Sequence, residues 1–143
     1  MKFLLDTNVF REIGRTAPNA NVADWLDKVD DIDLAISVLT VREVRKGIVK
    51  LRAKKPAAAN AIDTRVADIL AAFGERVLPV TSEIADLWGE LLGQSEKNID
   101  DAGLAATARI HGLVLVTRNI KHVADRGVAT LDPFKTSPRI VRP

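Results

Sequence analysis

The first ten residues, MKFLLDTNVF, end a short apolar run on a carboxylate. Residues 3–5 are typical of a buried strand, and Asp6 follows where that strand should stop, with Thr7 and Asn8 next. Helix capping explains Asp6 by itself, because its side chain can accept a hydrogen bond from the next helix. In a parallel sheet the same position would suit ligand binding, since ligands bind beyond the carboxyl ends of the strands.

Polar side chains follow three further apolar stretches or open the helices beside them: Ser37 and Thr40 with Glu43, Asp100 with Asp101, and Thr117 with Arg118 and Asn119. If the sheet is parallel, most of these groups converge at one edge. Helix geometry separates the adjacent acids. Asp101 lies on one stripe with Leu104 and Ala108, whereas Asp100 points about 100° away. Asp101 is therefore the acid expected to face the buried side.

Three carboxylates in one cleft, those of Asp6, Glu43 and Asp101, would repel each other by about 4 kcal/mol per pair at 4 Å and an effective dielectric of 20. They must protonate, pair with arginine or bind a cation. An oxygen-only set suits Mg²⁺ or Mn²⁺, and these ions support phosphodiester cleavage. Each acid also has a structural explanation, namely capping, a helix dipole or an ion pair with Lys46. The three together favour a metal site.

Several other chemistries find no support in the sequence. There is no cysteine, and neither GxxxxGK[ST], GxSxG nor a GxGxxG after a strand is present. His111 ends a predicted helix and His122 lies in a polar loop, so neither suggests a nucleophile–base pair. No signal peptide or membrane-spanning run is apparent, and a cytoplasmic protein without membrane contact is predicted.

Strands alternate with helices along the chain, which predicts a parallel sheet covered on both faces. The expected strands cover residues 3–5, 32–37, 77–80, 113–117 and 129–134. The expected helices cover residues 7–14, 22–29, 40–51, 56–73, 84–92 and 100–111. Pro79 indicates that the third strand is at an edge.

The net charge is only +2, but the stretch VREVRKGIVKLRAKK carries seven basic residues against Glu43 alone. A basic stripe of this kind can attract phosphates. It is equally explained as the solvated face of a helix, and the sequence leaves both readings open.

Four segments in order carry a family resemblance: LLDTNV, S-x-x-T-x-x-E from Ser37 to Glu43, D-x-x-L-A-A-T-A from Asp101 to Ala108, and L-V-T-R-N. Together they resemble PIN-domain ribonucleases, and more narrowly the VapC and FitB toxins of bacterial toxin–antitoxin pairs. The resemblance covers nearly the whole chain. It implies a PIN-like three-layer α/β/α fold with a central parallel sheet of four or five strands. Residues 1–135 would be a single PIN domain, and residues 136–143 a C-terminal tail and candidate flexible segment.

The same resemblance implies an endoribonuclease dependent on Mg²⁺ or Mn²⁺. The family's acidic cluster carries over onto Asp6, Glu43 and Asp101 as catalytic residues and metal ligands. Supporting roles carry over onto four polar residues, Asn8, Ser37, Thr117 and Asn119. Asn119 departs from the family pattern, because many members have a fourth acid there, so one or two metal ions remain possible. Basic residues near the cluster would contact the RNA backbone, and the candidates are Arg11, Arg45 and Lys46.

Family toxins are usually homodimers held inactive by a small antitoxin encoded beside them. The resemblance therefore implies an RNA substrate, an antitoxin partner that blocks the active-site groove, and contact with DNA only through that partner. A rival interpretation is a non-catalytic PIN-like module that dimerises and binds a DNA-binding partner. The missing fourth acid favours this rival, and the three retained acids count against it.

Overall fold

The computed structural model describes residues 1–143. Five strands form one parallel sheet in the order β3-β2-β1-β4-β5. They are β1 (Phe3–Leu5), β2 (Leu34–Ser37), β3 (Val77–Leu78), β4 (Val114–Val116) and β5 (Thr130–Leu131). The predicted α/β fold with a central parallel sheet is confirmed.

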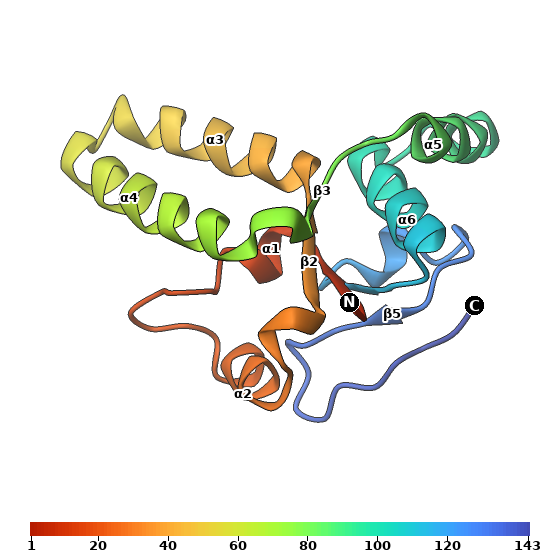
Figure 1. The fold of residues 1–143 in the computed structure, drawn as a ribbon, viewed down its shortest axis with the longest axis horizontal. Helices are drawn as coiled ribbons and strands as arrows, with labels where there is room; N and C mark the ends of the chain where they lie inside the picture. The colour runs from red at the N-terminus through yellow and green to blue at the C-terminus, as the bar shows by residue number, and fades with distance from the viewer.

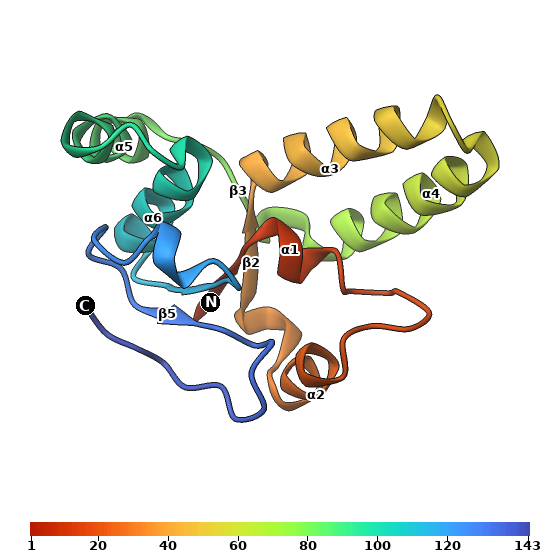
Figure 2. The same ribbon diagram turned by 180° about the vertical axis from the view of Figure 1, so that it is seen from behind.

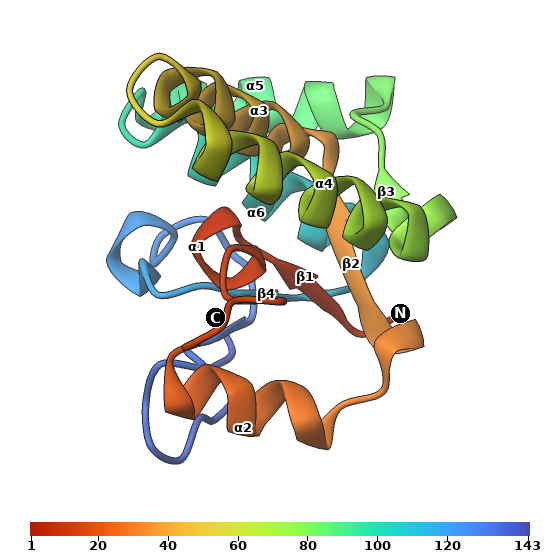
Figure 3. The ribbon, with the colours of Figure 1, turned by 90° about the vertical axis from the view of Figure 1, so that its left-hand side faces the viewer.

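Six α-helices surround the sheet (Figures 1 and 2). They are α1 (Thr7–Phe10), α2 (Ala20–Lys28), α3 (Val38–Arg52), α4 (Pro56–Phe73), α5 (Ser82–Gln94) and α6 (Ile99–His111). Three short 3₁₀ helices, η1 (Asp31–Asp33), η2 (Gly74–Arg76) and η3 (Ile120–His122), precede β2, β3 and β5. Helices α3 and α4 form a hairpin on one side, and α5 and α6 pair on the other. Figure 3 shows α2 below the sheet, away from these four helices.

The core has two parts because successive side chains of a strand point to opposite faces of the sheet. Leu4 and Leu115 pack in a cluster with residues of α5 and α6. Leu5 and Val116 pack in a second cluster with residues of α1 to α4. Both faces of the central strands are therefore buried, as an all-parallel sheet requires.

Several helix boundaries differ from the sequence prediction by one to four residues, and two of these differences are in the helices that follow β1 and β2. Helix α1 ends at Phe10, four residues before the predicted end, and turns lead on to Gly14, whose φ of +76° suits glycine. Helix α3 begins at Val38, two residues early, because the Ser37 hydroxyl accepts a hydrogen bond from the Leu39 amide at 3.0 Å. Asp6 thus follows the last residue of β1, Ser37 is the last residue of β2, and each caps the next helix.

The outer parts of the sheet are short. Strand β3 has two residues and lies at the edge, as Pro79 predicted. At the other edge, Thr130 of β5 exchanges two backbone hydrogen bonds with Val141, at 2.9 and 2.8 Å. The end of residues 136–143 is therefore held against the sheet.

Helix α6 approaches its neighbours closely because small residues face them. Ala102, Ala105 and Ala106 are fully buried. A Cβ atom at Gly103 would lie 2.8 Å from both Leu39 Cδ1 and Trp88 Cε2. This close approach fixes the start of α6, and with it Asp101. No helix has the length and apolar character needed to cross a membrane.

Candidate functional site

Asp6 is held in place from both sides of the β1 carboxyl end. Its Oδ1 accepts a hydrogen bond from the Thr7 amide at 2.7 Å, which caps α1. Its Oδ2 accepts a hydrogen bond from the Thr117 hydroxyl, at the end of β4, at 2.6 Å. The residue is only 6% exposed. Helix capping therefore does occur, and the second oxygen is fixed by a neighbouring strand.

Burial raises the pKa of the Asp6 carboxyl above its usual value, although the hydrogen bonds from Thr117 and Thr7 act in the opposite direction. The charge of Asp101 raises the pKa further, and His122 lowers it. An ionised Asp6 is therefore costly in this environment, and a cation beside it would offset the cost.

Asp101 and Asp100 bond to different parts of the molecule, as the helix geometry predicts. Asp101 Oδ2 lies 2.9 Å from Nδ1 of His122, which ends η3. Asp100 is ion-paired with Arg42 on α3. The side chain of Asp101 is 20% exposed and that of Asp100 is 43% exposed. Asp101 is therefore the more enclosed of the two.

Glu43 is paired with a neighbour on its own helix. Its Oε1 accepts a hydrogen bond from Arg42 Nη2 at 3.0 Å, and this bond is the main reason why the pKa of Glu43 is lowered. Lys46 and Arg11 lower it further through their charges. Glu43 is therefore stabilised in its ionised form, and Arg42 links it to Asp100 at the start of α6.

The three predicted acids line one cavity of about 230 Å³ at the carboxyl edge of the sheet. Its lining residues are Asp6, Thr7, Asn8, Arg11, Leu39, Glu43, Asp100, Asp101, Leu104 and Asn119. Asn8 Oδ1 is buried and has no hydrogen-bond partner. No three acidic or histidine side chains lie close enough in this arrangement to hold an ion together. The cavity thus contains several oxygen atoms that could bind a cation, but they do not converge on a single position.

The other predicted supporting residues act outside the cavity lining. Ser37 is fully buried and caps α3. Thr117 is also buried, and its hydroxyl both donates to Asp6 and accepts from the Asn119 amide at 3.0 Å. Thr117 therefore connects Asp6 to the backbone of Asn119.

The three basic candidates have different surroundings. Arg11 lines the acidic cavity, and its guanidinium lies over Gly47. Lys46 lines an adjoining open hollow of about 630 Å³, together with Glu43 and Asp101. Arg45 lines neither hollow.

Arg45 instead makes two hydrogen bonds to Asp63 on α4, at 2.9 and 2.8 Å. Asp63 also accepts a hydrogen bond from Arg52 at 2.9 Å. Part of the basic stretch therefore joins α3 to α4, which is a structural role that the sequence pattern did not show.

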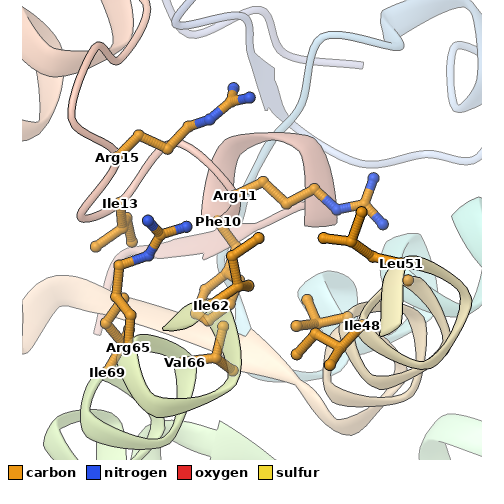
Figure 4. A pocket seen from close by; sticks show the side chains of 12 residues that line it. Phe10, Arg11, Ile13, Arg15, Ile48, Leu51, Ile62, Arg65, Val66 and Ile69 are labelled. Atoms are coloured by element: carbon orange, nitrogen blue, oxygen red, sulfur yellow. The ribbon is translucent and has the colours of Figure 1, made fainter. Parts of the chain in front are cut away.

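A second cavity, of about 430 Å³, lies between α1, α3 and α4 (Figure 4). Its walls are mostly apolar and include Ile48, Ile62 and Ile69. Arg11 and Arg65 also line it, and Arg65 Nε is buried without a hydrogen-bond partner. Arg11 lines both this apolar cavity and the acidic one, so the two adjoin.

Sequence reasoning missed two residues at the site, His122 and Arg42. The sequence predicts a polar loop around His122 and places Arg42 within a basic stripe, and neither pattern indicates a role at the site. His122 lies 21 residues from Asp101, and Arg42 lies 58 residues from Asp100. Neither separation matches a sequence motif. The one available signal was the proximity of His122 to Asn119 at the end of the fourth predicted strand.

The PIN domain model matches residues 3–125, and this chain belongs to the PIN domain family. It is 33% identical to Toxin FitB of Neisseria gonorrhoeae, over 92% of this chain and 97% of that protein. It is 28% identical to VapC ribonuclease Y4jK of Sinorhizobium fredii, over 92% of this chain and 97% of the relative.

Two solved structures agree with these relatives. The crystal structure of FitAcB from Neisseria gonorrhoeae superposes with a TM-score of 0.84 at 31% identity, covering 92% of this chain and 98% of that chain. The structure of FitAB bound to a DNA fragment gives a TM-score of 0.82 at 30% identity, over 94% of this chain and 97% of that chain. The predicted resemblance and the PIN-like fold are both confirmed.

Proposed function

We propose that this protein is the toxin of a toxin–antitoxin pair and acts as an endoribonuclease that requires Mg²⁺ or Mn²⁺. The observation that carries the proposal is the cavity that Asp6, Glu43 and Asp101 line together at the carboxyl edge of the sheet. The names of its relatives, Toxin FitB and VapC ribonuclease, support the same activity. An RNA substrate accords with action in the cytoplasm.

The residues present suit a divalent metal ion. Every candidate ligand offers oxygen, which Mg²⁺ and Mn²⁺ prefer. Asn8 Oδ1 is buried without a partner, and Asp6 is an acid whose ionised form is costly. Asp6 and Asp101 would hold the ion, and Glu43 would join them by leaving Arg42. Bound there, the ion would activate water for attack on the phosphodiester and neutralise the charge that develops.

The remaining residues would orient the acids and the substrate. Thr117 and Thr7 hold the two oxygens of Asp6. Arg11 and Lys46, beside the acidic hollows, would bind phosphates of the RNA backbone. Such contacts would weaken as the salt concentration rises. Asn119 would supply a neutral oxygen at the position where the family resemblance implies an acid in many members.

The test is cleavage of total tRNA and of a structured RNA by the purified, partner-free protein with Mg²⁺, Mn²⁺ or EDTA. Asp6→Asn and Asp101→Asn are compared with Asp68→Asn, the same change at an exposed position of α4. Cuts at defined positions that need metal and disappear only in the first two variants are expected. Equal cutting by all variants would identify a contaminating nuclease.

Absence of cleavage with either metal would instead favour the rival function, a non-catalytic module that works by dimerising and by binding a DNA-binding partner. The structure of FitAB bound to a DNA fragment supports a partner of that kind in either case. We propose that this protein also forms a homodimer and contacts DNA only through its antitoxin. Sedimentation of the chain alone tests the homodimer, and sedimentation of DNA with the chain, in the presence and absence of its partner, tests the contact with DNA.

The apolar cavity between α1, α3 and α4 is suited to a segment of the antitoxin. Its apolar walls would take the nonpolar face of a helix, and Arg65, with its unpartnered Nε, would take an acidic side chain. Because Arg11 joins this cavity to the acidic one, a segment bound here would lie next to the catalytic acids. Occupation of the groove would therefore inhibit cleavage.

Ile62→Lys tests this groove, with Ala67→Lys on the exposed face of the same helix as its control. Both variants are expected to cleave RNA as the wild type does. Only Ile62→Lys should escape inhibition by the protein encoded in the adjacent gene. Equal inhibition of both variants would exclude the groove as the binding site.

A further inference from the structure

His122 is joined to a candidate metal ligand although it lies 21 residues further along the chain. Its Nδ1 lies 2.9 Å from Asp101 Oδ2, and one ring nitrogen of a neutral imidazole can donate such a hydrogen bond. Asp101 is at the start of α6, and His122 ends η3. The contact therefore ties the first turn of α6 to the loop that follows β4.

Neither core packing nor helix capping accounts for this contact. The His122 side chain is 43% exposed, whereas the neighbouring Val123 is 2% exposed and belongs to the core. The start of α6 does not use Asp101 as a cap, and Asn98, the residue before the helix, makes no capping hydrogen bond through its side chain. Packing and capping thus leave the orientation of the Asp101 carboxylate to His122.

The hydrogen bond from His122 engages only one of the two carboxylate oxygens of Asp101. With Oδ2 engaged by His122, Oδ1 of Asp101 is left for the cavity that Asp6 lines. Asp6 is also oriented by hydrogen bonds, although both of its oxygens are engaged, Oδ2 by the Thr117 hydroxyl and Oδ1 by the Thr7 amide. Hydrogen bonds from outside a metal site orient its ligands, and losing one typically weakens metal binding by about 10- to 100-fold.

We propose that His122 is a positioning residue for the metal site, and that its Nδ1–H holds Asp101 in the orientation that binds the ion with Asp6. This inference rests on the proposed metal-dependent function. It requires only the neutral imidazole, so it does not depend on a change in protonation. The role belongs to this chain's own loop after β4, where Asn119 supplies no charge.

Three substitutions separate the hydrogen bond from the ring. In His122→Asn, the amide nitrogen occupies a position like that of Nδ1 and can still donate. In His122→Gln, the nitrogen lies one bond further out, and in His122→Phe the ring remains without a donor. Because the His122 side chain lies at the surface and outside the core, all three variants are expected to fold, which far-UV circular dichroism and thermal melting check.

The measurement is the affinity of the full, partner-free chain for Mn²⁺. Electron paramagnetic resonance of the free ion gives the amount of Mn²⁺ that remains unbound. His122→Phe should bind Mn²⁺ about ten-fold or more weakly than the wild type, and His122→Gln should also bind weakly. His122→Asn should stay within a few-fold of the wild type. In RNA cleavage, the Phe variant should need more metal while its KM for RNA is unchanged.

The outcomes distinguish this inference from the function beneath it. Wild-type binding that is lost in Asp6→Asn and unchanged in His122→Phe would support the metal site and overturn the role of His122. Equal weakening in the Asn and Phe variants would exclude the Nδ1 hydrogen bond as the cause. Failure of the wild type to bind Mn²⁺ would overturn the metal-dependent function and this inference together.

Discussion

The Thr117 hydroxyl donates a hydrogen bond of 2.6 Å to Oδ2 of Asp6, across 111 residues of sequence. The contact joins the carboxyl ends of β1 and β4, which are neighbours in the sheet. Parallel pairing brings these ends together, and the register of Leu5 opposite Val116 sets the two polar residues side by side. The order and register of the strands therefore place Asp6 beside Thr117, without a contribution from any loop.

Removing this hydroxyl should affect both stability and activity. Thr117→Val leaves the buried Asp6 oxygen and the Asn119 amide without their partner, a loss of about 1–3 kcal/mol. Thr117→Ser keeps the hydroxyl and should lose little. We expect urea unfolding to separate the two variants and RNA cleavage to fall at least ten-fold in Thr117→Val alone. Equal behaviour of both variants would show that methyl packing, rather than the hydroxyl, matters at this position.

Replacing the Asp6 carboxylate should stabilise the protein while abolishing its activity. The pKa of Asp6 is raised by burial in the folded state, so the folded protein binds more protons than the unfolded one as the pH rises past about 3.8. Stability from this group is thus lost as the pH rises through its folded pKa. Asp6→Asn should melt higher than the wild type at pH 7.

The gain from Asp6→Asn should shrink as the pH falls below about 4, where the wild-type carboxyl is protonated in both states. Saturating Mg²⁺ should also reduce the increase in melting temperature that Asp6→Asn causes at neutral pH, because the ion would stabilise only the wild type. Thermal melting of both proteins between pH 3 and pH 8, with and without Mg²⁺, measures each effect. A lower melting temperature for the variant at pH 7 would contradict the assigned cost of burying this charge.

Much of this site could be predicted from the sequence because backbone rules determine it. Alternating strands and helices imply a parallel sheet, and the carboxyl-edge rule then brings Asp6 near Asp101. The helical period correctly separates Asp101 from Asp100. These inferences need only the direction of the chain and the spacing of residues.

The rest depends on contacts between side chains that no spacing rule encodes. Arg42 pairs with Glu43 and Asp100, and His122 reaches Asp101 from a loop. Arg45 was a candidate for RNA binding, but its partner Asp63 is on α4, and only the packing of α3 on α4 brings them together. The partners of long charged side chains depend on how the helices pack against one another. The sequence pattern alone therefore does not predict these ion pairs.

The ion pairs of Asp63 should stabilise the α3–α4 hairpin in a pH-dependent manner. The hydrogen bond from Arg45, followed by that from Arg52, lowers the pKa of Asp63 to about 2. A folded pKa below the unfolded one gives stability that is present above about pH 4 and lost as the pH falls towards 2. Because exposed pairs contribute little, the effect should be modest and weakened by salt.

Asp63→Asn tests the hairpin pairs against Asp68→Asn, an exposed acid on the same helix. At pH 7 and low salt, Asp63→Asn should unfold at a slightly lower urea concentration than the wild type. The difference in urea midpoint between Asp63→Asn and the wild type should vanish by about pH 2 and become smaller in 1 M salt. Asp68→Asn should have the same midpoint as the wild type under all these conditions. A difference that persists at low pH would assign the effect to something other than the ion pairs.

The close approach at Gly103 leads to a prediction that links packing to the site. Gly103→Ala would put a Cβ atom 2.8 Å from Leu39 Cδ1 and from the Trp88 ring. Leucine can move its end, but the Trp88 ring is tied by its Nε1–H to the Ile99 carbonyl at 2.9 Å. We expect a loss of about 1–3 kcal/mol, typical of overpacking, in place of the usual gain from alanine in a helix.

Gly89→Ala is the matched control, because a Cβ atom there meets nothing within 4 Å. It should be neutral or stabilising by up to about 1 kcal/mol, since alanine favours the helix more than glycine does. Gly103→Ala should also shift Trp88 fluorescence and reduce RNA cleavage, because relieving the clash displaces α6, which carries Asp101, from α3, which carries Glu43. Equal stability of the two variants would show that α6 can retreat without cost and that the close contact does not fix the site.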